Sequence, residues 1–179
     1  MRDTETTGDS WATGPYRNEA EQTAFIQGLV EKWKARKWPH FEDKIVGENY
    51  PRLMRVFAST DSVMKAPDDE LFDALCTLHS FHDRLRFFDG GMPTWKKTFL
   101  AANMPKRVRE SLCYLVFGDG DVIERMANMI YNQDYWLNEF GQSAVQELVG
   151  WRNREDLPVI NGRTTKVLRF FGSKVRQIA

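Results

Sequence analysis

The spacing of hydrophobic positions along the chain predicts helices almost throughout. From Asn18 onward, apolar side chains recur at intervals that bring them to one face of a helix, as Phe25, Leu29 and Trp33 do. No stretch alternates apolar and polar residues for long enough to require a strand. The sequence therefore predicts an all-α fold.

Start and stop signals divide this pattern into separate helices. Trp38-Pro39 is expected to end the first helix, because the residue before a proline avoids the α conformation. Pro105 is expected to open one helix, and Asp121 is expected to cap another. The helices after the first are expected near residues 50–58, 67–88, 92–103, 105–117, 122–131, 141–149 and 161–172.

The composition fits a folded domain of ordinary size. The chain has 179 residues, of which 42% are hydrophobic, too many for a disordered protein. Cys76 and Cys113 stand beside apolar residues, so we interpret them as reduced core positions and expect neither a metal nor a cofactor. No apolar run reaches the length of a membrane span, and residues 1–14 lack the features of a signal peptide. We therefore expect a cytoplasmic protein without a membrane partner.

The formal net charge is zero, but the charges are unevenly distributed. Residues 1–90 carry 12 basic and 16 acidic side chains, whereas residues 91–179 carry 13 and 9. A modestly basic C-terminal half suits a polyanionic partner. A solvated helical face is the alternative interpretation of the same residues.

The most specific pattern lies in the last third of the chain. Leu137-Asn138-Glu139-Phe140-Gly141 stands between two expected helices, and Leu157-Pro158-Val159-Ile160-Asn161 leads into a basic helix that closes at Phe171-Gly172. This order resembles the helix-hairpin-helix region of the endonuclease-III-type DNA glycosylase superfamily. The segment 78–172 is also similar to accessory regions of bacterial restriction and phage-defence proteins.

The sequence and the resemblance together predict a division of the chain and a partner. Residues 1–14, rich in Thr, Gly, Asp and Ser, are expected to form a flexible tail, and residues 15–117 a helical part. The resemblance implies that residues 118–179 form the helix-hairpin-helix part, packed with the preceding helices as one domain. The partner would be DNA, bound through its phosphate backbone. A nuclease or a motor ATPase of a restriction, defence or repair assembly is a possible second partner.

The hairpin supplies the expected phosphate site. Main-chain N–H groups at a helix N-terminus lack partners within the helix, and the helix dipole adds positive charge there. The candidate donors are the amides of Gly141, Gln142, Ser143 and Ala144, together with the Ser143 hydroxyl. The alternative is that Gly141 only allows the turn.

Departures from the family pattern argue against catalysis. The positions that match the catalytic lysine and aspartate of the family carry Ser143 and Asn161, which cannot perform their roles. Asn138-Glu139 replaces the usual Pro-Gly, and the carboxylate of Glu139 would repel a phosphate. The resemblance therefore implies a non-catalytic DNA-binding module.

The helix after Asn161 is expected to add basic contacts. Its apolar face would contain Val167, Leu168, Phe170 and Phe171, with Thr165 opposite. Trp136, just before the hairpin, is a candidate for stacking on a base. The basic residues expected to contact DNA are Arg163, Lys166, Arg169 and Lys174.

Two other functions remain open. His79, His82 and Asp83 share one side of an expected helix, so a DNA-processing enzyme of glycosylase or metal-dependent type is one alternative. The other is a protein-interaction domain, which the zero net charge and Glu139 favour.

Overall fold

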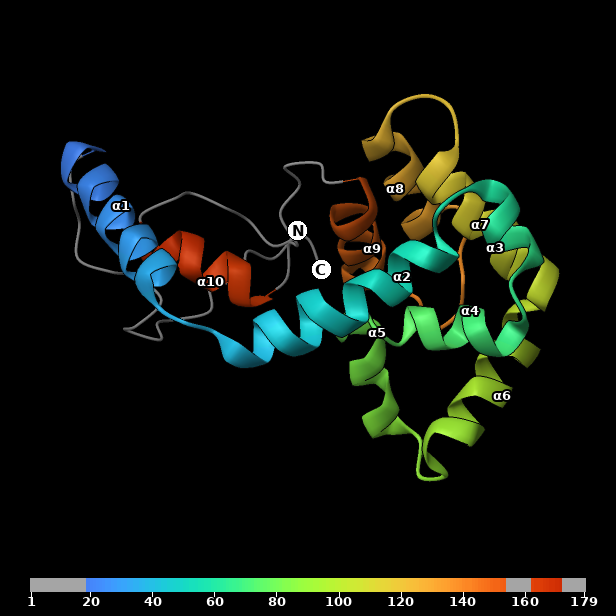
Figure 1. Ribbon diagram of the computed structural model, residues 1–179. Helices are drawn as coiled ribbons and strands as arrows, with labels where there is room; N and C mark the ends of the chain where they lie inside the picture. The colour runs from blue at the N-terminus through green and yellow to red at the C-terminus, as the bar shows by residue number, and fades with distance from the viewer. Residues whose placement is uncertain (1–18, 154–161, 172–179) are drawn as a thin grey trace. The chain divides into compact units, whose positions relative to one another are not determined.

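A computed structural model describes residues 19–153 and 162–171. Every regular element in these two ranges is a helix, which confirms the all-α prediction. None of the helices within them is both long and apolar enough to cross a membrane. In Figure 1 the chain runs from α1, in blue, to α10, in red.

The described helices fall into two units. One unit pairs α1 (Glu19–Ala35) with α10 (Gly162–Phe170), and the other holds all the elements from Pro39 to the end of α9. The elements of the larger unit are η1 (Phe41–Asn49), α2 (Tyr50–Val56), α3 (Thr60–Lys65), α4 (Asp68–Leu75), α5 (His79–His82), η2 (Asp83–Phe87), α6 (Gly91–Asn103), α7 (Pro105–Phe117), α8 (Val122–Tyr131) and α9 (Gln142–Asn153).

Local signals placed several helix ends correctly. Asp121 caps α8, where its Oδ1 accepts hydrogen bonds from the main-chain N–H groups of Ile123 (2.6 Å) and Glu124 (3.2 Å). Pro105 is the first residue of α7, where its missing N–H costs nothing. The helix that contains Phe25 ends before Trp38, as expected.

The prediction of one helix over residues 67–88 is wrong. The chain leaves the helical conformation after α4, and Leu78 is extended, with a ψ of 122°. The Thr77 hydroxyl donates a hydrogen bond to the carbonyl oxygen of Ala74 at 2.6 Å. A new helix, α5, then starts at His79, and a short 3₁₀ segment, η2, follows it.

A carboxylate from α9 holds this new helix start. Glu147 accepts hydrogen bonds from the main-chain N–H groups of His79 (2.7 Å) and Ser80 (2.8 Å), and also from the Ser80 hydroxyl. These amides would otherwise lack partners at the first turn of α5. Glu147 therefore acts as an N-cap supplied by a distant helix, and it fixes α5 against α9.

The core of the larger unit is rich in aromatic rings. Phe81 packs between Trp95, Phe99 and Phe140, with ring centroids 4.6 to 5.5 Å apart, and Phe72 lies 5.1 Å from Trp95. All five side chains are essentially inaccessible to water. Burial of such large rings stabilises this unit.

The smaller unit is a pair of helices joined by aromatic contacts. The ring of Phe25 on α1 lies 6.5 Å from that of Phe170 and 5.9 Å from that of Phe171. The apolar face predicted for the last helix is wrong in part, because Val167 (51% exposed) and Leu168 (37%) face solvent, whereas Thr165 is buried. A pair of helices has one interface, so only the residues at that interface are shielded from solvent.

Candidate nucleic-acid interface

The loop between α8 and α9, residues 132–141, leads into the candidate phosphate site. The buried Asn103 side chain fixes this loop, since its Oδ1 accepts from the Asn138 N–H (2.6 Å) and its Nδ2 donates to the Asn138 carbonyl (3.0 Å). Arg107 donates to the carbonyl oxygens of Gln133 and Trp136. These contacts fix the loop and therefore the position of the N-terminus of α9.

Glu139 is the strained residue of the turn. Its φ of 66° lies in the left-handed region, which disfavours every residue except glycine. Its carboxylate accepts hydrogen bonds from the Arg84 guanidinium, at 2.7 Å from Nε and at a shorter distance from Nη2. This ion pair neutralises the negative charge that the sequence places beside the predicted phosphate site.

Gly141 does not have the role of a turn residue. Its φ is outside the left-handed region, and a Cβ added to it would meet nothing within 4 Å. The positive φ of this turn is therefore at Glu139 and not at Gly141. The absence of a side chain at Gly141 leaves the main chain open to a close approach from outside.

Among the described residues, three of the four predicted amides have no hydrogen-bond acceptor. The Ala144 N–H donates to the Gly141 carbonyl at 2.9 Å, so it is not free for a ligand. Across residues 19–153 and 162–171, no acceptor pairs with the amides of Gly141, Gln142 or Ser143. Gly141 and Gln142 are exposed and Ser143 is half-buried. The N-terminus of α9 can therefore donate hydrogen bonds to an anion.

The predicted basic contacts fall in the other unit. Lys166 and Arg169 are exposed on α10, which belongs to the same unit as α1. The side chain of Arg163 and all of Lys174 lie outside the described residues, as do Asn161 and Gly172. The predicted DNA contacts therefore divide between two units.

An exposed aromatic ring lies just before the hairpin. Trp136 is 44% exposed, although Arg107 donates a hydrogen bond to its carbonyl oxygen at 3.1 Å. Because its main chain is fixed by Arg107 and its ring is partly exposed, Trp136 is suited to stacking on an unpaired base.

The His79, His82 and Asp83 set does not form a metal centre. Asp83 pairs with Arg86 at 3.2 Å, and the helix expected to align the three residues is interrupted there. Within the described part of the chain, no group of three or more histidine, cysteine, aspartate or glutamate side chains is arranged to hold a metal ion. The structure instead brings His40 close to His79 and His82 in one pocket.

Both cysteines are free, and both are poor nucleophiles. Burial is the main cause that raises the pKa of the Cys76 thiol, to about 12, with a further contribution from Asp73. Burial also raises the pKa of Cys113. Since the thiolate is the reactive form, neither residue is suited to covalent catalysis at neutral pH.

Sequence reasoning missed the residues that position this site. Arg84 on η2 pairs with Glu139, and Asn103 on α6 holds Asn138; no local pattern indicates either of these contacts. Comparisons with protein-family models, with curated proteins and with solved structures each gave no match.

Proposed function

We propose that this chain is a non-catalytic DNA-binding module that contacts the phosphate backbone largely without regard to sequence. The observation that carries the proposal is the N-terminus of α9. In the part of the chain that the structure describes, no acceptor pairs with three of its amides, and the neighbouring carboxylate of Glu139 is paired with Arg84. Such donors recognise phosphate oxygens and carry no information about the bases.

Basic residues on α10 would add further phosphate contacts. Lys166 and Arg169 are exposed there, and Trp136 offers a ring for stacking near the hairpin. The chain would thus hold a duplex, while a nuclease or motor ATPase of a restriction, defence or repair assembly performs the chemistry. We expect this assembly in the cytoplasm.

The substitution Gln142→Glu tests the α9 site without harming the fold. A carboxylate in the first turn of a helix is favourable by about 0.3 to 1 kcal/mol, because it complements the dipole. The same carboxylate would repel a phosphate at the neighbouring amides. We expect stability to be kept or increased, and affinity for a 20-base-pair duplex to fall about tenfold at low salt.

The matched control is Gln27→Glu, which makes the same change at an exposed position in the middle of α1. Fluorescence anisotropy with labelled duplexes of two unrelated sequences, from 25 to 200 mM salt, measures both variants. The wild-type protein should bind both duplexes alike, with affinity falling steeply as salt rises. Equal affinities for the two variants would remove the α9 N-terminus from the interface.

Gly141→Ala gives a second measurement at the same site. A Cβ at this position meets no protein atom, so the fold should be unaffected. It would, however, obstruct a phosphate that approaches the main chain. Undiminished DNA binding by a folded Gly141→Ala protein would argue against close contact at α9.

A further inference from the structure

The outer side of α8 carries an exposed row of apolar residues. Ile123, Ala127 and Tyr131 stand four positions apart, so they line one side of the helix over successive turns. All three are exposed, Ile123 at 52% and Tyr131 at 75%. The buried side of α8 carries Met126 and Met129, and the helix packs on α7 and α9 within the larger unit. We call the exposed row of Ile123, Ala127 and Tyr131 the α8 stripe.

An apolar outer side is unusual for a helix at a protein surface. Such a helix normally presents charged residues to solvent, and a helix that is apolar all round is normally covered. α8 has two charged residues, and one of them, Arg125, is buried, where it donates hydrogen bonds to the carbonyl oxygens of Leu115 and Gly120. Glu124 is therefore the one charged side chain that α8 exposes. The α8 stripe has the composition of a surface on which another element packs.

Exposed carboxylates surround the α8 stripe. Two precede the helix, one lies in its first turn, and one follows its C-terminus: Asp119, Asp121, Glu124 and Asp134. Asp121 caps the helix. Among the described residues, no basic side chain forms an ion pair with any of the four. Their negative charges therefore remain available to a partner.

The basic groups near this surface are directed to the main chain. Arg125 is buried on the inner side of α8, and the half-buried Arg107 of α7 donates to two carbonyl oxygens in the loop after α8. Four carboxylates thus stand against two guanidinium groups, and the carboxylates are the exposed groups. The surface around the α8 stripe is negative.

This distribution of charge decides between the possible occupants. A nucleic acid would bring phosphates close to the carboxylates, and like charges repel. A two-fold symmetric pair of copies would set the same surface against itself, so that acidic groups would again face acidic groups. A helix with an apolar side bordered by lysine or arginine matches both the stripe and its surroundings.

We propose that the α8 stripe docks a basic amphipathic helix of a partner protein. Apolar side chains of that helix pack on Ile123, Ala127 and Tyr131, while its basic side chains pair with Glu124 and with the carboxylates at the two ends of α8. α8 has ten residues and is about 15 Å long, so the contact extends over about three turns of the partner. This inference is independent of DNA binding at the start of α9.

A labelled model peptide tests the proposal on the whole chain. Two repeats of Leu-Lys-Lys-Leu-Leu-Lys-Leu place leucine on one side of a helix and lysine on the other. Fluorescence anisotropy compares this peptide with a twin in which glutamate replaces each lysine. We expect the lysine peptide to bind at least about tenfold more tightly at 50 mM salt, with affinity that falls as salt rises. Equal affinities, or no binding of the lysine peptide at 200 μM protein, overturn the proposal.

Tyr131→Ala and Phe87→Ala form a matched pair for locating the contact. Both rings are exposed, but Phe87 (59%) lies beside the guanidinium groups of Arg84 and Arg86, at 4.7 and 4.8 Å. We expect Tyr131→Ala to weaken binding of the lysine peptide about tenfold, since aromatic anchors dominate such contacts, and Phe87→Ala to leave it unchanged. Ile123→Ser is the second variant if Tyr131→Ala fails to fold. Equal effects at the two rings overturn the assignment.

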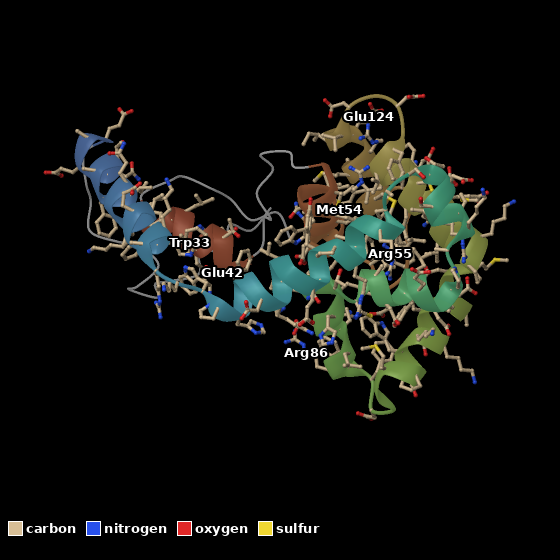
Figure 2. The ribbon with its side chains drawn as sticks, in the orientation of Figure 1. Trp33, Glu42, Met54, Arg55, Arg86 and Glu124 are labelled. Atoms are coloured by element: carbon tan, nitrogen blue, oxygen red, sulfur yellow. The ribbon has the colours of Figure 1, made fainter. Side chains whose placement is uncertain are left out.

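Glu124→Gln and Glu110→Gln test the charge. Glu124, labelled in Figure 2, lies on α8, whereas Glu110 is exposed on α7 and forms an ion pair with Lys106. We expect Glu124→Gln to weaken the lysine peptide about threefold at 50 mM salt and to have little effect at 500 mM, because salt screens the interaction. An effect of Glu110→Gln as large as that of Glu124→Gln counts against the proposal.

The other occupants are tested with the same Tyr131→Ala variant. Sedimentation velocity should give the same molecular mass for this variant and for the wild-type chain, and both should bind a DNA duplex alike. A dimer that Tyr131→Ala converts to a monomer would assign the stripe to a second copy. A loss of duplex binding in Tyr131→Ala would assign it to DNA. Either result overturns the proposal, whereas weak duplex binding by every variant would contradict only the function proposed for α9.

Discussion

Glu147 is the residue whose removal best tests how this fold is held together. Its carboxylate accepts hydrogen bonds from the main-chain N–H groups of His79 and Ser80 and from the Ser80 hydroxyl. The substitution Glu147→Ala leaves all three donors without their acceptor. The N-cap residue of α5, Leu78, has no polar side chain and makes no cap hydrogen bond.

The expected loss of stability follows from these contacts. Loss of an N-cap costs about 0.5 to 2 kcal/mol, and a hydrogen bond to a charged group contributes about 1.5 to 3 kcal/mol. His79 is exposed and Ser80 half-buried, so water can replace part of the hydrogen bonding that the two residues lose with Glu147. We expect Glu147→Ala to lower the free energy of unfolding by about 2 to 3 kcal/mol. Glu147→Gln keeps one acceptor oxygen and should lose about half as much.

Urea unfolding followed by circular dichroism measures these changes. Thermal unfolding should show a decrease in Tm of about 5 to 10 °C for Glu147→Ala in a chain of this length. Glu110→Ala is the matched control, because Glu110 is exposed on α7 and forms a surface ion pair with Lys106 at 3.6 Å. The control should change stability by no more than about 0.5 kcal/mol.

Amide hydrogen exchange gives the local readout. In Glu147→Ala the amides of His79 and Ser80 should exchange much faster than in the wild-type protein, while the amides of α7 stay protected. The reasoning fails if Glu147→Ala is as stable as Glu110→Ala, or if the two amides keep their protection.

Two further predictions concern the loop before α9 and a buried thiol. Asn103→Ala should cost about 2 to 3 kcal/mol in thermal unfolding, because Asn138 loses both of its partners, and a loss below about 0.5 kcal/mol would contradict this role. The raised pKa of Cys76, about 12, should lower its thiolate fraction at pH 8 about a thousandfold relative to an ordinary thiol. Alkylation of Cys76 by iodoacetamide, followed by mass spectrometry, should therefore be slow until the pH is well above 9, and rapid labelling in the folded protein at pH 8 would refute the argument.

Predictions succeeded where the determining contacts are local. The Asp121 cap bonds to residues two and three positions later, and Pro105 acts through its own ring. Such signals are contained in a few consecutive residues. The helical character of the chain and several helix ends could therefore be predicted from the sequence.

Predictions failed where a distant residue decides the backbone conformation. The apolar spacing through residues 67–88 suits one helix, but the chain breaks before His79 because Glu147 caps a new start there. The α3 helix and the π-helical winding of residues 41–49 also lacked a recognised signal. The hydrogen bonds of a π-helix, which join residues five apart, cannot be predicted from the spacing of apolar residues.

The candidate site was predictable only in part. The sequence indicated the amides near Gly141, and three of them are open in the structure. It also suggested repulsion from Glu139, which Arg84 removes by an ion pair across 55 residues of chain. His40 joins the other histidines through the tertiary fold, so the pocket could not be foreseen from spacing along the chain.

The pairing of α1 with α10 has a consequence for synthesis. During translation Phe25 emerges long before Phe170 and Phe171, which supply its aromatic contacts. The larger unit can collapse as soon as α9 has left the ribosome, whereas the contacts of Phe25 form only after α10 has emerged. The pairing of α1 with α10 should therefore be a late step in the folding of the nascent chain.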